Sequence, residues 1–109
     1  FFELIIVSDY DLARAEATVA WVAQKHPEVA DRFIAAKIDA SNPDDVSAVA
    51  TQHGATHVMN AVEPKFVPTI FAGALAAGAD YLDMAMSLSE PHPTNPHEET
   101  GVKLGDEDP

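Results

Sequence analysis

The sequence predicts an α/β fold in which parallel strands alternate with helices. Four short apolar segments of strand length alternate with three segments that show helical periodicity. The first apolar segment holds four consecutive aliphatic residues, which suits a strand buried on both faces of a sheet. Successive strands that are joined by helices pair in parallel through right-handed crossovers. A parallel sheet with flanking helices therefore follows.

The N-terminal segment contains the first predicted strand, residues 4–9, which ends in Asp9. Asp11 is placed to cap a helix that extends to about His26, and Pro27 provides a stop. The apolar face that this helix would lay on the sheet comprises Leu12, Ala15, Val19, Val22 and Ala23.

The second predicted strand, residues 33–39, also ends in an acid, Asp39. A clear helix start follows it, because Asn42 is a good N-cap and Pro43 suits the first helical position. Gly54 is placed for the left-handed turn that ends many helices. The apolar face of this helix comprises Val46, Val49 and Ala50.

The third predicted strand covers residues 57–62, and the fourth covers residues 81–85. Between them lies a helix that begins among prolines and ends at Gly78. Gly73 lies inside this helix, and we expect it to permit a close approach to the sheet. The apolar side comprises Ile70, Phe71, Ala74, Leu75 and Ala77.

Composition narrows the classes of partner. The chain carries 18 Asp and Glu against 6 Lys and Arg, a formal net charge of -12. Such a surface repels phosphate backbones and anionic lipid, so we expect neither nucleic acid nor a membrane as a partner. No apolar run is long enough to span a bilayer, and we expect no secretory leader. The absence of cysteine excludes disulfides and thiol catalysis and is typical of a cytoplasmic protein.

Several segments, taken in order, resemble the saccharopine dehydrogenase-like family. They are residues 1–16, Lys37-Ile38-Asp39-Ala40, Val58-Met59-Asn60-Ala61, Gly78 through Met86, and His92-Pro93 with Gly101 through Glu107. The resemblance implies an NAD(P)-dependent oxidoreductase with a Rossmann domain and a separate substrate region. Its substrate would be a secondary amine that joins an amino acid or a polyamine to a keto acid or an aldehyde, as in lysine and other amino-acid metabolism. A homodimer is left open.

The resemblance also predicts how the chain is divided. Residues 1–86 would be a partial NAD(P)-binding Rossmann domain, and residues 87–109 a proline-rich, acidic loop that leads toward an absent substrate domain. The sequence holds no Gly-x-Gly-x-x-Gly, so its strands would be numbers 2 to 5 of the 3-2-1-4-5-6 order. The missing first strand would leave a gap of about 9–10 Å in the sheet. We therefore expect a piece of a longer protein that is inactive by itself.

Asp9 is the main candidate for cofactor binding. A carboxylate at the end of the second Rossmann strand accepts hydrogen bonds from both ribose hydroxyls and repels a 2′-phosphate, which favours NAD over NADP. Two alternatives stay open. Arg14 could receive a 2′-phosphate, which would allow NADP, and Asp9 could merely cap the helix that follows.

The remaining predicted cofactor-binding residues follow the ends of the strands. They are Tyr10, Asp39, Ala40, Asn60, Ala61, Val62 and Asp83. Asp39 resembles an acid on the adenine side, or it is a turn residue. By resemblance Asn60 and its neighbours pass under the cofactor, or Asn60 is a satisfied strand-end amide. Asp83 would face the nicotinamide or the substrate, although a structural role in satisfying backbone N–H groups is favoured.

The sequence assigns no catalytic acid or base, and we expect no metal site, since the histidines lack regular ligand spacing. Three other classes share some features of the sequence. A receiver-like signalling module needs a lysine just after its last strand, and none is present. A short-chain dehydrogenase needs a tyrosine followed four positions later by lysine, and neither tyrosine has one. A non-catalytic scaffold of the same family stays open.

Overall fold

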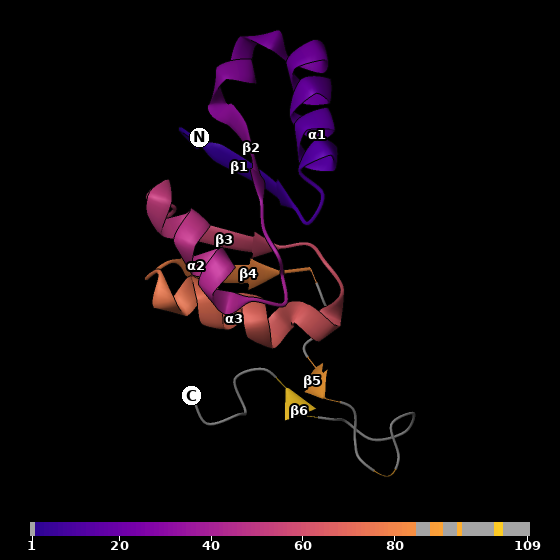
Figure 1. Ribbon diagram of the computed structural model, residues 1–109, viewed down its shortest axis with the longest axis vertical. Helices are drawn as coiled ribbons and strands as arrows, with labels where there is room; N and C mark the ends of the chain where they lie inside the picture. The colour runs from indigo at the N-terminus through magenta and orange to yellow at the C-terminus, as the bar shows by residue number, and fades with distance from the viewer. Residues whose placement is uncertain (1, 85–87, 91–93, 95–101, 104–109) are drawn as a thin grey trace. The chain divides into compact units, whose positions relative to one another are not determined.

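The computed structural model describes residues 2–84, 88–90, 94 and 102–103 (Figure 1). The chain divides into two compact units, Phe1–Asp39 and Ala40–Pro109. Both units are α/β, with short parallel strands and flanking helices, as in part of a Rossmann-like domain. The predicted fold class is therefore confirmed.

The first unit is a strand-helix-strand motif. It contains β1 (Ile5–Asp9), α1 (Leu12–Lys25), a 3₁₀ helix (Pro27–Arg32) and β2 (Phe33–Lys37). The strands β1 and β2 pair in parallel, and α1 packs beside both of them (Figure 1). Asp9 is the register partner of Lys37, so β2 ends two residues before Asp39, its predicted last residue.

The local sequence signals of this unit act as predicted. The Asp11 carboxylate accepts a hydrogen bond from the Ala13 backbone N–H at 3.0 Å, which caps α1. The helix ends before Pro27, which opens the 3₁₀ helix that leads into β2. Ala15 is buried, whereas Leu12 remains exposed, so the predicted apolar face packs only in part.

The second unit has a second parallel pair of strands and two helices. It contains α2 (Pro43–Gln52), β3 (His57–Asn60), a 3₁₀ helix (Pro64–Phe66), α3 (Val67–Ala76) and β4 (Asp80–Asp83). The strands β3 and β4 are in register from His57 and Asp80 to Asn60 and Asp83. The core of the unit comes from α2 and α3, namely Val46, Ala50, Val67, Ile70 and Ala74.

The helix ends of the second unit also follow the sequence. The Asn42 amide oxygen accepts a hydrogen bond from the Asp44 backbone N–H at 3.0 Å, and Pro43 is the first residue of α2. Gly54 and Gly78 take left-handed backbone conformations, with φ of 62° and 71°. These are the positions at which a residue without a Cβ is favoured.

The expected role of Gly73 needs correction. We predicted that it would let α3 approach the sheet, but it faces α2. A Cβ at this position would lie 2.6 Å from Val46 Cβ and 2.8 Å from the Pro43 carbonyl oxygen. The two helices share the apolar core of the unit, so the missing side chain allows helix-to-helix contact.

The segment after β4 differs in part from the predicted loop of residues 87–109. The structure describes β5 (Leu88–Glu90) and β6 (Val102–Lys103), which pair antiparallel with a register irregularity. Part of the predicted loop, including His92 and Pro93, lies outside the described residues. The predicted strands 57–62 and 81–85 are also shorter in the structure, where they end at Asn60 and Asp83.

The strand pairing matches two neighbouring pairs of the Rossmann order. Among the described residues, β1 pairs with β2, and β3 pairs with β4, in separate two-stranded parallel sheets. In the 3-2-1-4-5-6 order, these correspond to strands 2 and 3 and to strands 4 and 5. The observed pairs are those expected if the first Rossmann strand is not among the four.

Candidate functional site

The carboxyl end of β1 presents Asp9 together with a nearby cation. One carboxylate oxygen of Asp9, Oδ1, accepts a hydrogen bond from the Asp11 backbone N–H at 2.8 Å. The same oxygen lies 3.2 Å from Nη2 of Arg14, which comes from the first turn of α1. The Asp9 side chain is 34% exposed. A carboxylate with this exposure remains accessible to a ligand, and it is also one of the groups that order the turn into α1.

Arg14 is held loosely at this end of the sheet. Its Nε lies 3.9 Å from the Asp11 carboxylate, and its side chain is 68% exposed. Ion pairs in water contribute about 0–1 kcal/mol, because solvent screens them and ordering two long side chains costs entropy. Arg14 can therefore exchange its present partners for another anion at small cost.

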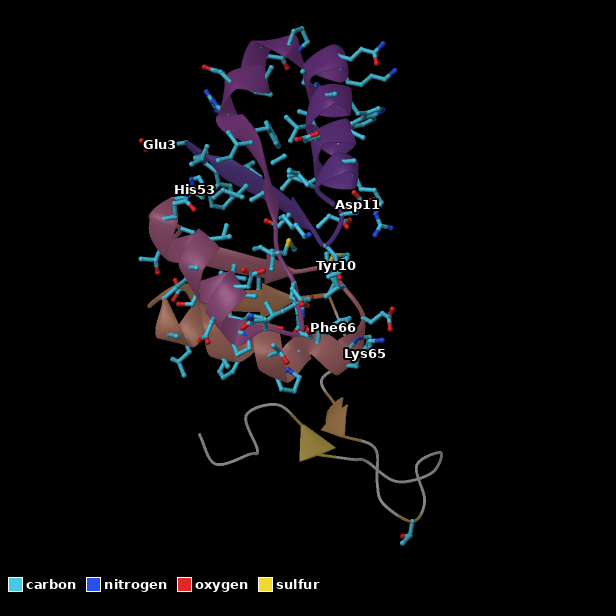
Figure 2. All side chains as sticks on the ribbon, in the orientation of Figure 1. Glu3, Tyr10, Asp11, His53, Lys65 and Phe66 are labelled. Carbon is cyan, nitrogen blue, oxygen red and sulfur yellow. The ribbon has the colours of Figure 1, made fainter. Side chains whose placement is uncertain are left out.

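Tyr10 and Lys37 complete the surface around Asp9. Figure 2 shows the side chains of Tyr10 and Asp11 where the chain passes from β1 to α1. Tyr10 is 65% exposed, and Nζ of Lys37 lies 5.4 Å from the centre of its ring, in the geometry of a cation–π contact. This end of the first unit thus combines an acid, two cations and an exposed aromatic ring.

Asp39 and Ala40 follow β2 and fall at the boundary between the units, where Asp39 ends the first and Ala40 begins the second. Both are half-buried. Of the predicted cofactor-binding residues, the structure brings Asp9 and Tyr10 together with Lys37 in the first unit. It brings Asn60, Val62 and Asp83 together in the second.

The carboxyl end of the β3–β4 pair holds a polar cluster in which Asn60 is buried and Tyr81 and Asp83 are half-buried. Asn60 is 2% exposed. Its side-chain Nδ2 donates to the Tyr81 hydroxyl at 3.0 Å, and its Oδ1 accepts from the Val62 backbone N–H at 2.9 Å. The Tyr81 hydroxyl in turn donates to Oδ2 of Asp83 at 2.9 Å. Asn60 is thus the satisfied strand-end amide that was one of its two predicted roles.

Sequence reasoning did not identify Tyr81 as part of a site. Its ring meets the Phe71 ring of α3 edge to face, with centroids 5.4 Å apart and an interplanar angle of 87°. Burial raises the pKa of Tyr81 to about 12; the hydrogen bond from Asn60 works against this shift, whereas Asp83 adds to it. The available signal was the i, i+2 spacing of Tyr81 and Asp83 in one strand. Their relation to Asn60 depends on the strand register, which local sequence does not reveal.

The residues that follow β3 are more open. Ala61 and Val62 are exposed, although the Val62 N–H is tied to the Asn60 side chain. This is a turn in which an asparagine side chain replaces a backbone acceptor. It leaves the small side chain of Ala61 at the surface, so a ligand could approach the backbone closely here.

Other parts of the molecule contribute less to a site. At the amino end of the β3–β4 pair, Nε2 of His57 lies 3.7 Å from Oδ2 of Asp80. Within the part of the chain that the structure describes, no group of three or more His, Asp or Glu side chains gathers as a metal-binding cluster. An open hollow of about 200 Å³ lies at the amino end of the β1–β2 pair, away from Asp9. It is lined by Phe2, Ile5, Val29, Arg32 and Phe33.

Comparison with known families decides the class. The family model for the saccharopine dehydrogenase NADP binding domain matches residues 1–107. The chain belongs to this family. No curated protein matches the chain significantly. The family assignment confirms the predicted resemblance and the nucleotide-binding portion of an oxidoreductase with a nicotinamide dinucleotide cofactor. It selects this interpretation over the receiver-like and short-chain dehydrogenase alternatives.

The structure shows which residues of this saccharopine dehydrogenase-family chain are accessible to a dinucleotide. Asp9 has an accessible carboxylate at the strand end, and Tyr10 and Ala61 are exposed at the same ends of their strands. Within the first unit, the accessible Asp9 carboxylate and the exposed Tyr10 ring have the chemistry to hold the ribose and the flat base of a dinucleotide. None of the described helices is both long enough and apolar enough to cross a membrane.

Proposed function

We propose that this chain is the nucleotide-binding portion of an oxidoreductase that acts on the C–N bond of a secondary amine. Such an amine joins an amino acid or a polyamine to a keto acid or an aldehyde. The observation that carries the cofactor part is the accessible Asp9 carboxylate at the carboxyl end of β1. When bound, the dinucleotide supplies a hydride donor or acceptor. The substrate part of the proposal rests on the family alone.

Each predicted residue then has a defined task. Asp9 accepts hydrogen bonds from the two ribose hydroxyls, and the exposed Tyr10 ring lies against the adenine end. Asp39 and Ala40 belong to the adenine side. The second unit contributes to the rest of the dinucleotide: Ala61 and Val62 offer backbone and small side-chain surface, and Asn60 supports them from below. Asp83 lies on the nicotinamide side.

We further propose that the protein prefers NAD to NADP. The carboxylate of Asp9 attracts hydroxyl donors and repels a 2′-phosphate. Arg14 opposes this preference, because its guanidinium is positive, exposed and 3.2 Å from Asp9. In the present arrangement Asp9 engages Arg14 and reduces its ability to bind a phosphate. Cofactor choice is thus set by which partner Arg14 takes.

A complete dinucleotide-binding site also needs a further strand in addition to the two parallel pairs of this chain. The parallel pairs β1–β2 and β3–β4 correspond to the two flanks of a Rossmann sheet. We propose that a longer protein supplies the central strand with its glycine loop, which binds the pyrophosphate, and a separate region that binds the amine. Residues 1–86 would form the nucleotide-binding part, and residues 87–109 the connection to that region.

The test uses the complete protein that carries this chain. Titration with NAD⁺ and NADP⁺ gives the two dissociation constants for the wild type and for Asp9→Asn. The amide keeps an oxygen for the Asp11 N–H but loses the charge. We expect NAD⁺ to bind about 10- to 150-fold more weakly, because a hydrogen bond to a charged group contributes about 1.5–3 kcal/mol. We expect NADP⁺ to bind more tightly, since Arg14 loses its ion pair with Asp9 and keeps only the longer contact with Asp11.

Asp31→Asn serves as the matched control. Asp31 is an exposed acid in the same unit, in the 3₁₀ helix before the start of β2, so its loss changes the net charge equally at the other end of the strand. This variant should leave both dissociation constants unchanged. A clear NADP⁺ preference of the wild-type protein would overturn the proposed role of Asp9. A complete protein that binds dinucleotide but transfers no hydride with any secondary amine would favour the scaffold alternative.

A further inference from the structure

The buried cluster of the second unit contains a group that the proposed function does not use, the Tyr81 hydroxyl. It lies between Asn60 and Asp83, at 3.0 Å and 2.9 Å. The cluster faces α3, where the Tyr81 ring packs on Phe71. Asn60 is nearly inaccessible to water, so its hydrogen-bonding groups depend on these protein partners.

The hydrogen bonds of this cluster run in one direction. A carboxylate only accepts, so the Tyr81 hydroxyl must use its single proton to donate to Asp83. It is then left only with lone pairs for Asn60, which must present its NH₂ group to the hydroxyl. The amide oxygen of Asn60 consequently points to the Val62 N–H. In the reverse orientation, the Asn60 NH₂ group would face the Val62 N–H, and two donors cannot form a hydrogen bond.

The state of the hydroxyl supports this order. Burial raises the pKa of Tyr81 to about 12, so the proton that Asp83 accepts is present at neutral pH. The position of Asp83 is set by its register with Asn60 across the β3–β4 pair. The backbone pairing also continues one step beyond the strands, because the Met84 N–H donates to the Asn60 carbonyl at 3.2 Å.

The end of this chain of hydrogen bonds is the turn formed by residues 60–62. The Val62 N–H, held at 2.9 Å by Asn60, closes that turn just after β3. Ala61 lies between the two bonded residues and is exposed. The half-buried Tyr81 hydroxyl is therefore linked, through the buried Asn60 amide, to the shape of an exposed backbone segment.

We propose that Tyr81 is a positioning residue for dinucleotide binding. Held by Asp83, its hydroxyl sets the orientation of the Asn60 amide and thereby the turn 60–62 on which the dinucleotide lies. This inference rests on the proposed function, which assigns that turn to the cofactor site. Tyr81 itself does not touch the cofactor in this scheme.

The test compares Tyr81→Phe with Phe71→Leu in the complete protein. Tyr81→Phe keeps the ring and loses the hydroxyl, whereas Phe71→Leu weakens the packing and keeps the hydroxyl. Two quantities are measured for each: the exchange rate of the Val62 backbone amide with solvent by NMR, and the dissociation constants of NAD⁺ and NADP⁺. The melting temperature of each variant reports its general loss of stability.

We expect Tyr81→Phe to speed Val62 exchange and to weaken dinucleotide binding, each by about three- to tenfold, since one hydrogen bond is lost. Phe71→Leu should lower the melting temperature without either effect. An unchanged exchange rate in Tyr81→Phe would overturn the link from Tyr81 to the turn. Faster exchange with unchanged binding would overturn the positioning role.

Two further results distinguish a failure of the Tyr81 proposal from a failure of the proposed function. If the wild-type protein binds neither NAD⁺ nor NADP⁺, the proposed function fails, whatever the exchange data show. If Tyr81→Phe does not fold, the wild-type spectrum provides the second measurement. The Asn60 side-chain NH₂ protons and the Val62 amide should then both exchange slowly, and rapid exchange of either would overturn the proposal.

Discussion

The ends of the two parallel strand pairs use polar residues in opposite ways. At the end of β1 and β2, Asp9, Arg14 and Lys37 are exposed in part or in full, and their charges make an ion pair and a cation–π contact. At the end of β3 and β4, Asn60 is buried and Tyr81 is half-buried, and their contacts are hydrogen bonds of defined direction, from Asn60 to Tyr81 and from Tyr81 to Asp83.

This difference indicates two kinds of task. Water screens the exposed charges, so each contact is weak and can be exchanged for a ligand. Removal from water makes the buried contacts expensive to break, so they hold geometry instead. The exposed residues at the end of β1 and β2 are suited to discriminate between ligands, and the hydrogen-bonded residues at the end of β3 and β4 are suited to hold the shape of the backbone.

The largest expected effect comes from Asn60→Ala. This change leaves the Val62 N–H without its acceptor and the Tyr81 hydroxyl without its donor, and we expect a loss of about 2–3 kcal/mol in the free energy of unfolding. Urea denaturation measures it. Asn42→Ala is the matched control, because Asn42 accepts a backbone N–H two residues ahead in the same way but in an exposed N-cap, and should cost about 1 kcal/mol. Equal losses would contradict the distinction between buried and exposed clusters.

The second prediction concerns alkaline pH. The pKa of Tyr81 is about 12 in the folded protein, against an ordinary value of 10.0. The unfolded chain therefore loses this proton first as the pH rises. The contribution of Tyr81 to stability should be complete below about pH 10 and should be lost progressively between about pH 10 and 12. The ultraviolet absorbance of tyrosinate, compared with that of Tyr81→Phe, follows this titration; a step assigned to Tyr81 near pH 10 would show that its hydroxyl is not held as described.

The smallest effect is expected at the exposed end. Arg14→Gln removes the ion pair with Asp9, and we expect the free energy of unfolding to change by no more than about 0.5 kcal/mol. The change should shrink further as salt is added, because the pair is exposed. Thermal unfolding at low and high ionic strength measures both. A loss as large as that of Asn60→Ala would mean that the charged group is structural and not available for a ligand.

Local sequence was sufficient for the caps and turns at the helix ends. Asp11 and Asn42 cap α1 and α2 as predicted, and Gly54 and Gly78 adopt the left-handed turns expected of them. Asp9 could also be placed at the end of β1 from the aliphatic run before it. Caps, turns and strand cores depend on a few neighbouring residues, so their signals are contained within short stretches.

Only the tertiary structure determined which residues distant in sequence are in contact. The register of β3 with β4 brings Asn60 opposite Asp83 and within reach of Tyr81, which the sequence analysis had not assigned to a site. Gly73 was expected to contact the sheet, but because α2 packs on α3 it contacts α2. Both outcomes depend on residues more than 20 positions apart, whose approach is set by the burial of shared apolar surface and not by any local preference.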